Sequence, residues 1–425
     1  MRRRGLLLLL ALLGGLGLLF AGSPAYAEGE AIRGKVVGPV IDDTRSPVEG
    51  VAVTVSGAGG FTQTVTSDDT GSFEVPLPAP GEYTVKLDTA TLPEGLSTPQ
   101  PERTLTVGAG EQKAALFPLN EGDGPAEVAS TPLWEQAAQL AADGLVLGLV
   151  LALGGVGLSL IYGTTGLTNF SHGELITLGG IAGYIFNNVL GVPFLLAMAL
   201  AVLACGILGG IQDKLLWARL RKRGTGLIAM LVVSIGFGIF LRYLILFFFG
   251  GQSQDFSEYA GQAGLQWGPI SITPKALIGS IIAALLLVAT AFWLLRTRIG
   301  KATRAVSDNP ALAAASGIDV ERVINTVWVI GAALAAFGGI LLGMNQRVSW
   351  QMGFQILLLI FAGVTVGGLG TAFGALVGCL LVGLVIQLST LFVPTELKSV
   401  GALVILILVL LVRPQGILGR RERIG

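Results

Sequence analysis

The sequence predicts a polytopic α-helical membrane protein, with about nine membrane segments of which some are broken, and an N-terminal extracytoplasmic all-β sandwich. Hydrophobic residues make up 52% of the 425-residue chain and charged residues only 13%, which is typical of a protein that lies largely in lipid. Apolar stretches follow one another from Leu140 onward, whereas residues 28–118 contain short β-branched runs between turns. A secretory signal at residues 1–27 places the sandwich outside the cytoplasm.

The first 27 residues have the three parts of a signal peptide. A charged start, an apolar core and a small-x-small cleavage site follow one another at Arg2–Arg4, Gly5–Phe20 and Ala25–Ala27. The apolar core is long enough that an uncleaved membrane anchor is the alternative. In either case, we expect the residues that follow to lie outside the cytoplasm.

Residues 28–118 are expected to form the β-sandwich, because runs of β-branched residues alternate there with Gly, Pro and Asp. The expected strands are residues 32–37, 51–55, 63–67, 72–75, 83–87 and 104–107. Apolar and polar residues alternate within them at short spacing, which predicts a small antiparallel sandwich. The turn acids Asp42–Asp43 and Asp68–Asp69 are expected to face solvent rather than to bind calcium.

Three patterns in this segment, at Pro47–Val53, Thr66–Phe73 and Pro80–Tyr83, resemble those of carboxypeptidase regulatory-like (transthyretin-like) domains. The segment contains no His and no Cys, so we expect a spacer or docking domain rather than an enzyme. A stretch rich in Gly, Pro and acids at 119–133 is expected to link it to a membrane domain at 134–425.

Nine apolar segments of the second domain are expected to be membrane segments. They are residues 140–162, 174–191, 193–213, 226–250, 275–295, 323–344, 354–369, 374–391 and 399–412. Lys and Arg gather at 214–223, 296–322 and 413–423, and cytoplasmic loops collect these residues. The loop at 251–273 has acids and no base, so we expect it outside. Nine crossings from an exported N-terminus put the C-terminus in the cytoplasm.

The densest polar cluster of the membrane domain, Asn169–Glu174, follows a glycine-containing turn at residues 163–166. Irregular backbone and polar side chains inside lipid are costly, and they usually mark a pathway or a partner. We therefore predict that Asn169, His172 and Glu174 belong to a substrate path. The alternative is a structural break, at which Asn169 caps the next helix and Ser171 forms a capping box with Glu174.

This cluster resembles the pattern near the start of LivH-type permeases, the membrane subunits of branched-chain amino acid ABC importers. In that pattern a Tyr-Gly pair precedes Asn-Phe-(Ala/Ser)-His-Gly-Glu and a Gly-rich helix. The matching residues are Tyr162, Gly163, Asn169, Phe170, His172, Gly173 and Glu174. Thr164, Thr165 and Thr168 depart from it, since apolar residues are common at these positions. Permeases for urea and short amides share much of the pattern.

A second break is expected at Gly367, Gly368 and Gly370, because so many glycines cannot hold a stable helix. Interrupted segments in both halves of a transporter point to a binding site at the membrane midplane, so we predict that these glycines also belong to the substrate path. The alternative is close helix packing, since Gly370, Gly374 and Gly378 recur at four-residue spacing. LivH-type permeases have a similar Gly-Gly-(Leu/Ile)-Gly-x-x-x-Gly-Ala pattern.

The basic segment 296–322 contains a short Ala-rich helix, which Asp308 or Asn309 caps, Pro310 begins and Gly317 ends. The segment resembles the coupling loop of LivH-type permeases, which implies that it receives the movement of an ATPase. The coupling residues that this resemblance implies are Gly300, Arg304, Asn309, Pro310, Ala313 and Gly317. The alternative is an ordinary basic cytoplasmic loop.

Two arginines, Arg242 and Arg347, lie near or within segments that approach the outer face. We expect their side chains to reach the lipid headgroups, because long basic side chains can keep their charge in water while their stems lie on apolar surface. Lining a pathway is the alternative role for both.

The sequence excludes several classes of function. It contains no Gly-x-x-x-x-Gly-Lys-(Ser/Thr) motif, so the chain cannot bind ATP through a P-loop. It has a single histidine, and both cysteines, Cys205 and Cys379, lie inside apolar runs, so we expect neither a multi-histidine metal site nor a disulfide framework. We expect no catalytic residues, no metal and no cofactor of its own. The balance of 27 basic and 27 acidic residues gives no sign of a nucleic-acid partner.

The resemblance implies a permease in a bacterial cell membrane, in contact with lipid, that carries branched-chain amino acids. It also implies three partners: a second permease subunit, cytoplasmic ATP-binding subunits that use the ATP, and an extracytoplasmic substrate-binding protein. The alternatives are a permease for urea or short amides, an ion-coupled carrier without an ATPase, and a non-transport protein whose helices only scaffold the sandwich. A carrier needs acids within the membrane, and only Glu174 and the interfacial Asp143 qualify.

Overall fold

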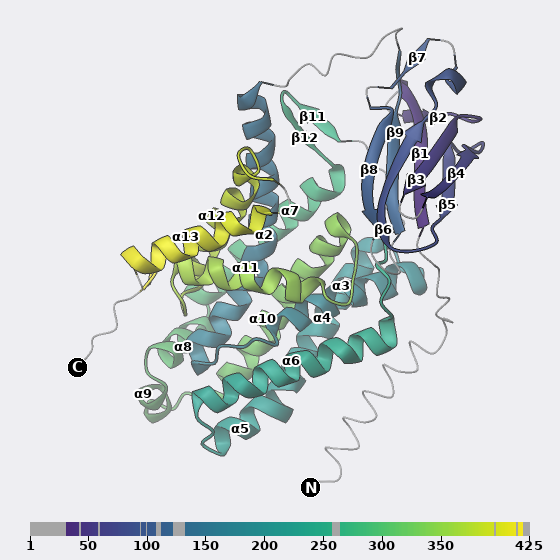
Figure 1. Ribbon diagram of the computed structural model, residues 1–425. Coiled ribbons are helices and arrows are strands. Elements are labelled where there is room, and N and C mark those ends of the chain that lie inside the picture. The colour runs from purple at the N-terminus through teal and green to yellow at the C-terminus, as the bar shows by residue number, and fades with distance from the viewer. Residues whose placement is uncertain are drawn as a thin grey trace. The chain divides into compact units, whose positions relative to one another are not determined.

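The computed structural model (Figure 1) has two compact units, a β-sandwich that precedes residue 133 and a helical bundle from Leu133 onward. The signal peptide, Asp42–Asp43 and most of the linker lie outside the residues that it describes. The described residues are 31–41, 44–57, 60–93, 95–98, 100–107, 112–121, 132–256, 264–394, 397–413 and 415–419.

The described part of the sandwich contains two four-stranded sheets and a two-stranded ribbon. The first sheet consists of β1 (Ala31–Ile41), β2 (Thr44–Pro47), β5 (Ser72–Pro76) and β9 (Gln112–Pro118). Strand β1 pairs with each of the other three. The second sheet has the order β4 (Phe61–Thr66), β3 (Ala52–Gly57), β6 (Gly81–Leu87) and β8 (Glu102–Val107). The ribbon pairs β7 (Leu96–Ser97) with β10 (Asn120–Glu121).

All six predicted strands are present, but the prediction of a purely antiparallel sandwich is wrong for one pair. Strand β9 runs parallel to β1, with Ile32 opposite Lys113. It follows β8 of the other sheet, so the chain crosses between the sheets and returns in the direction of β1. Phe117 of β9 and the following Leu119 are fully buried. With β10, the sandwich thus continues to residue 121, within the stretch predicted as linker.

Asp68 organises the turn between β4 and β5. Its Oδ1 accepts hydrogen bonds from the backbone N–H of Thr70 (2.9 Å) and Ser72 (2.8 Å) and from the Thr70 hydroxyl (2.7 Å). The hydrogen bond from the Thr70 side chain and those from the backbone lower the pKa of Asp68 below its ordinary value of 3.8. The adjacent Gly71 has a positive φ of 69°, which favours glycine.

Because the pKa of Asp68 is lower in the folded state, its ionised form stabilises the sandwich above pH ~4, and this stabilisation is lost as the pH falls through the folded-state pKa. Asp68→Asn keeps the acceptor oxygen and removes the charge. We expect this variant to lose less stability than the wild type between about pH 6 and about pH 3. Calorimetry of the isolated sandwich would measure the difference, and equal losses in both proteins would contradict it.

The helical bundle begins with a long helix and contains several interruptions (Figure 1). Its elements are α2 (Leu133–Thr165), α3 (His172–Tyr184), the π-helical turn η3 (Ile185–Val189), α4 (Phe194–Gln212), the π-helical turn η4 (Asp213–Trp217), α5 (Ala218–Lys222), α6 (Leu227–Phe249), β11 (Leu265–Trp267), β12 (Ile270–Ile272), α7 (Pro274–Arg296), α8 (Arg298–Asp308), α9 (Pro310–Ala315), α10 (Val320–Gln346), α11 (Met352–Gly367), α12 (Ala372–Ser389) and α13 (Lys398–Val412).

Within the described residues, a helix occupies each of the nine predicted membrane positions. Six spans are long and apolar enough to cross a bilayer: α2, α4–α5, α6, α7, α10 and α12. The other three helices, α3, α11 and α13, have 13, 16 and 15 residues. The chain is therefore a polytopic membrane protein, and the count of nine crossings is not confirmed.

Helices α2 and α10 form the centre of the bundle. In the apolar stretch of each of these two helices 78% of the residues are buried, whereas the buried share is only 17% in α6 and 28% in α7. Their close approach depends on glycine, because a Cβ at Gly157 would lie only 2.6 Å from the carbonyl oxygen of Gly331. Small residues allow such contact between helices in a membrane. Helices α6 and α7 therefore lie at the periphery of this subunit.

Candidate functional site

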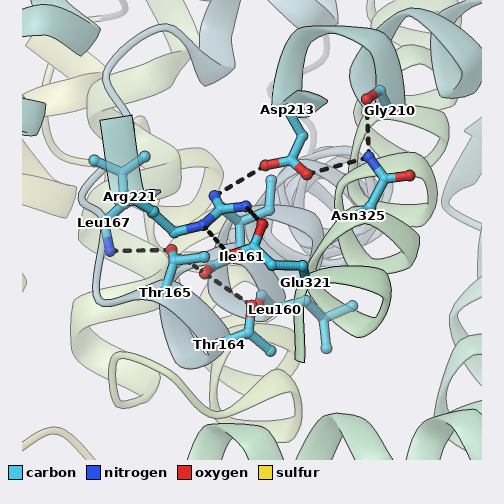
Figure 2. Close-up of polar contacts among 10 residues, drawn as sticks. All are labelled: Leu160, Ile161, Thr164, Thr165, Leu167, Gly210, Asp213, Arg221, Glu321 and Asn325. Carbon is cyan, nitrogen blue, oxygen red and sulfur yellow. Dashed lines mark hydrogen bonds and ion pairs between the residues drawn. The ribbon is translucent and has the colours of Figure 1, made fainter. Parts of the chain in front are cut away.

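The first predicted break is present, and threonines stabilise its beginning (Figure 2). Helix α2 ends at Thr165, and Gly166 follows with a φ of 69°. The hydroxyls of Thr164 and Thr165 donate to carbonyl oxygens of the preceding turn, and the Thr165 hydroxyl also accepts from the N–H of Leu167 at 3.2 Å. The two threonines that depart from the LivH-type pattern thus satisfy backbone groups at the helix end.

Asn169 and Ser171 hold the irregular segment together, and both are fully buried. The Asn169 Oδ1 atom accepts hydrogen bonds from the backbone N–H (3.1 Å) and the hydroxyl (2.6 Å) of Ser171. Ser171 makes no side-chain capping bond, so the predicted capping box with Glu174 is wrong. The reason is that the Ser171 hydroxyl is already bound to Asn169, while the Glu174 side chain pairs with another helix.

His172 ties the start of α3 to the interior of α2. Its Nε2 atom lies 2.9 Å from the carbonyl oxygen of Gly154, and because a carbonyl only accepts, Nε2 donates this bond. Gly154 lies eleven residues before the end of α2, which is about 17 Å along the helix. The break therefore lies deep in the bundle, where the fully buried His172 contacts the backbone of α2.

Glu174 forms an ion pair with Arg242 of α6. The Arg242 Nε and Nη2 atoms donate to the same carboxylate oxygen, Oε1, at 3.0 and 2.9 Å. The Glu174 side chain is 1% exposed and that of Arg242 15%. The expectation that Arg242 reaches the headgroups is therefore wrong, because a buried carboxylate offers its charge a closer partner. Arg347 instead pairs at 2.8 Å with Asp255, and both side chains are about half exposed.

The second predicted break is also present, and its described contacts are to other parts of the same protein. Helix α11 ends at Gly367, and Gly368 and Gly370 have positive φ values of 118° and 80°. The C-terminal segment lies against this turn, since Ile417 N–H donates to Val366 and Leu418 N–H donates to Gly367. Gly370 packs near the end of α2, Gly368 against the C-terminal segment and Gly367 against α12. Contact with substrate stays a prediction for these three glycines.

The predicted coupling segment consists of α8 and α9. Asn309 caps α9 by accepting from Leu312 N–H at 3.0 Å, and Pro310 begins the helix. Gly317 has a φ of 85° just after the helix end. Gly300 of α8 packs on the backbone of α7, where a Cβ would collide with the carbonyl of Trp293. These residues define the shape of the segment.

Helix α9 turns Ala313 toward the bundle and Leu312 toward the surface. Ala313 is only 4% exposed, and its part in coupling stays a prediction. Leu312 is 65% exposed, and the basic side chain of Arg304 on α8 is exposed as well. The signal that identifies Leu312 is that it is the one large apolar side chain in an otherwise small-residue helix, PALAAA.

A polar network joins α10 to α4, η4 and α5 (Figure 2). Arg221 pairs with the buried Asp213 at 2.9 Å and with Glu321 of the first turn of α10 at 3.0 Å. Asn325, one turn further along α10, donates to Asp213 at 3.1 Å and to the carbonyl of Gly210 at 2.8 Å. Sequence analysis missed this network, because its members lie about 100 residues apart and resemble ordinary loop charges.

The comparisons with known proteins agree with this architecture. Residues 140–410 match the family described as "Branched-chain amino acid transport system / permease component". The chain belongs to this family. Residues 35–119 match the carboxypeptidase regulatory-like domain. Both resemblances predicted from the sequence are confirmed.

The related proteins are transport permeases rather than enzymes. The chain is 32% identical over 292 residues to the "High-affinity branched-chain amino acid transport system permease protein LivH" of Salmonella typhimurium, a match that covers 66% of this chain and 94% of that protein. It is 30% identical over 300 residues to the corresponding BraD of Pseudomonas aeruginosa, covering 66% and 95%. LivM of Escherichia coli is 25% identical over 305 residues, covering 65% and 69%.

The polar network gives a test of stability. Arg221→Met leaves the buried Asp213 carboxylate without its cationic partner, so we expect it to lower the free energy of unfolding by about 3–5 kcal/mol. Glu321 is 41% exposed, and we expect Glu321→Gln to cost less than about 1 kcal/mol. Thermal unfolding of the purified protein in detergent measures both changes. Equal effects of the two substitutions would contradict the assignment of Asp213 as the buried member that needs Arg221.

Proposed function

We propose that this chain is the permease subunit of an ABC importer and forms the transmembrane path for branched-chain amino acids. An external binding protein delivers the substrate, and separate cytoplasmic ATPase subunits drive transport with the ATP that they hydrolyse. The observation that carries the proposal is α9, a helix capped at its N-terminus by Asn309 that presents the exposed Leu312, while the preceding helix α8 carries the exposed basic Arg304. Such a helix suits an apolar cleft in a soluble partner.

The distribution of charge supports the orientation of the chain in a bacterial plasma membrane. The α5 segment and the α7–α8 junction carry the basic residues Arg219, Arg221, Arg296 and Arg298. Such residues favour the cytoplasmic side. In this orientation α9 faces the cytoplasm, the sandwich is outside, and the chain ends inside.

The substrate path in this proposal runs beside the first break. Asn169, His172 and Glu174 are fully buried polar residues on a segment that interrupts the bundle, and such residues in a membrane are costly unless they serve a pathway or a partner. A second permease subunit would complete the path. Helix α6 has the most exposed span and carries Arg242, so it is the element that we assign to this boundary.

The docking role of α9 can be tested by co-purification. Leu312→Glu places a charge on the apolar contact, so we expect the membrane-extracted protein to lose its ATPase subunit. Leu312→Met keeps the apolar side chain and serves as the matched control that retains the ATPase. A wild-type protein that is purified without an ATPase under gentle conditions would contradict the importer and favour the ion-coupled carrier. Retention of the ATPase by Leu312→Glu would contradict the role of α9.

The sandwich is proposed as a docking or guiding domain for the binding protein. We expect deletion of residues 30–118, with the signal segment retained, to reduce uptake when substrate is limiting and to leave uptake at saturating substrate nearly unchanged. The reason is that a guiding domain raises the rate at which the binding protein meets the permease productively, and not the rate at which the permease carries substrate across the membrane. Uptake by reconstituted vesicles at the two concentrations measures this difference, and unchanged uptake at limiting substrate would contradict the role.

A further inference from the structure

We propose that Arg242 and Glu174 form a receptor for the zwitterionic head of an α-amino acid, with Arg242 binding its carboxylate and Glu174 its ammonium group. This inference rests on the proposed function and deepens it, since it assigns the substrate's charged groups to two side chains. Both side chains are largely buried, and Arg242 is seven residues from the end of α6, about 10 Å along the helix.

The ion pair is incomplete on one side. Arg242 directs two donors, Nε and Nη2, at Oε1 of Glu174, whereas the common arrangement of arginine with a carboxylate uses both oxygens. Within the described residues, Oε2 of Glu174 is buried and has no hydrogen-bond partner. A buried acceptor without a partner is costly. The Glu174 carboxylate can therefore accept a hydrogen bond from one further donor, and Nη1 of Arg242 can donate to one further acceptor.

An aromatic surface lies directly beside the pair. The guanidinium of Arg242 lies 3.6 Å from the ring centroid of Phe354 on α11, and this ring is 50% exposed. Phe361, two turns further along the same helix, contacts Phe170 with ring centroids 4.9 Å apart. Leu358 lies between the two phenylalanines and is 55% exposed. An apolar wall thus begins at the charged pair and continues along α11.

This arrangement matches the chemistry of a branched-chain amino acid. The fork of a guanidinium suits a carboxylate, an ammonium group supplies the donor that Oε2 lacks, and an aliphatic side chain packs on the aromatic wall. Urea and neutral amides have no charged group to exchange with either partner. They would offer Oε2 and the Nη1 edge only neutral hydrogen bonds, which are weaker than hydrogen bonds between charged groups. The site therefore favours amino acids over amides.

The test uses the importer assembled with its partner subunits in proteoliposomes, with labelled leucine as the probe. Glu174→Gln/Arg242→Gln removes both charges together, so no buried ion is left alone. We expect leucine uptake to fall at least about tenfold, as for the loss of a charged hydrogen bond, while ATP hydrolysis and subunit assembly are retained. Arg242→Lys keeps the ion pair and loses the fork, so a purely structural pair predicts normal uptake, and the receptor predicts reduced uptake.

The matched control is Asp255→Asn/Arg347→Gln, which neutralises the half-exposed ion pair and should leave uptake unchanged. Normal leucine uptake by Arg242→Lys, or by the neutral double variant, would overturn the receptor while leaving the importer in place. If the double variant does not assemble, the uptake by Arg242→Lys decides. A wild-type assembly that imports urea or acetamide but no leucine would instead contradict the proposed substrate class, and the two failures are thus distinguishable.

Discussion

The structure of the membrane domain depends on one constraint, that polar groups within lipid must find their partners inside the protein. Residues 166–174 impose the largest demand of this kind, because helix is interrupted there and four polar side chains are buried. Two helices meet the demand: α2 offers the carbonyl of Gly154 to His172, and α6 offers Arg242 to Glu174 and the Ser234 hydroxyl, which accepts from the backbone N–H of Phe170 at 3.1 Å. The position of α6 against the break is thus set by hydrogen bonds and charge.

Helix α10 connects α9, the proposed docking helix, with α3, the helix that follows the first break. Its first turn carries Glu321, which the Arg221 network holds, and it begins three residues after the Gly317 turn that ends the α9 segment. Further along, Gly339 packs against the backbone of Ile176 in α3, so closely that a Cβ would collide. In this account, a movement of α9 therefore reaches the broken helix through one continuous and largely buried element.

Features set by neighbouring residues could be predicted from the sequence. The cap at Asn309, the stop at Gly317 and both helix breaks are of this kind, and each is present. The pairing of Glu174 with Arg242 was not predictable, because 68 residues separate them and hydropathy alone favours an arginine that reaches water. The burial of Ala313 and the exposure of Leu312 were not predictable either, because a six-residue helix of small apolar residues shows no periodicity.

Strand β9 was missed for a related reason. Its sequence, QKAALFP, contains no β-branched residue, and its place is determined by pairing with β1 and by burial of Phe117. Tertiary packing thus overrides local propensity in this strand. In both domains, local chemistry predicted where elements begin and end, whereas long-range pairing determined which faces meet.

If Glu174 and Arg242 receive the substrate, the surface beside them lines an aqueous path rather than lipid. The most direct measurement is labelling of single cysteines in the assembled importer with a charged, membrane-impermeant thiol reagent, since the native Cys205 and Cys379 are buried. We expect Leu358→Cys to be labelled, and Val288→Cys, on the exposed face of α7, to remain unlabelled. Labelling of neither cysteine, or of both at equal rates, would contradict it.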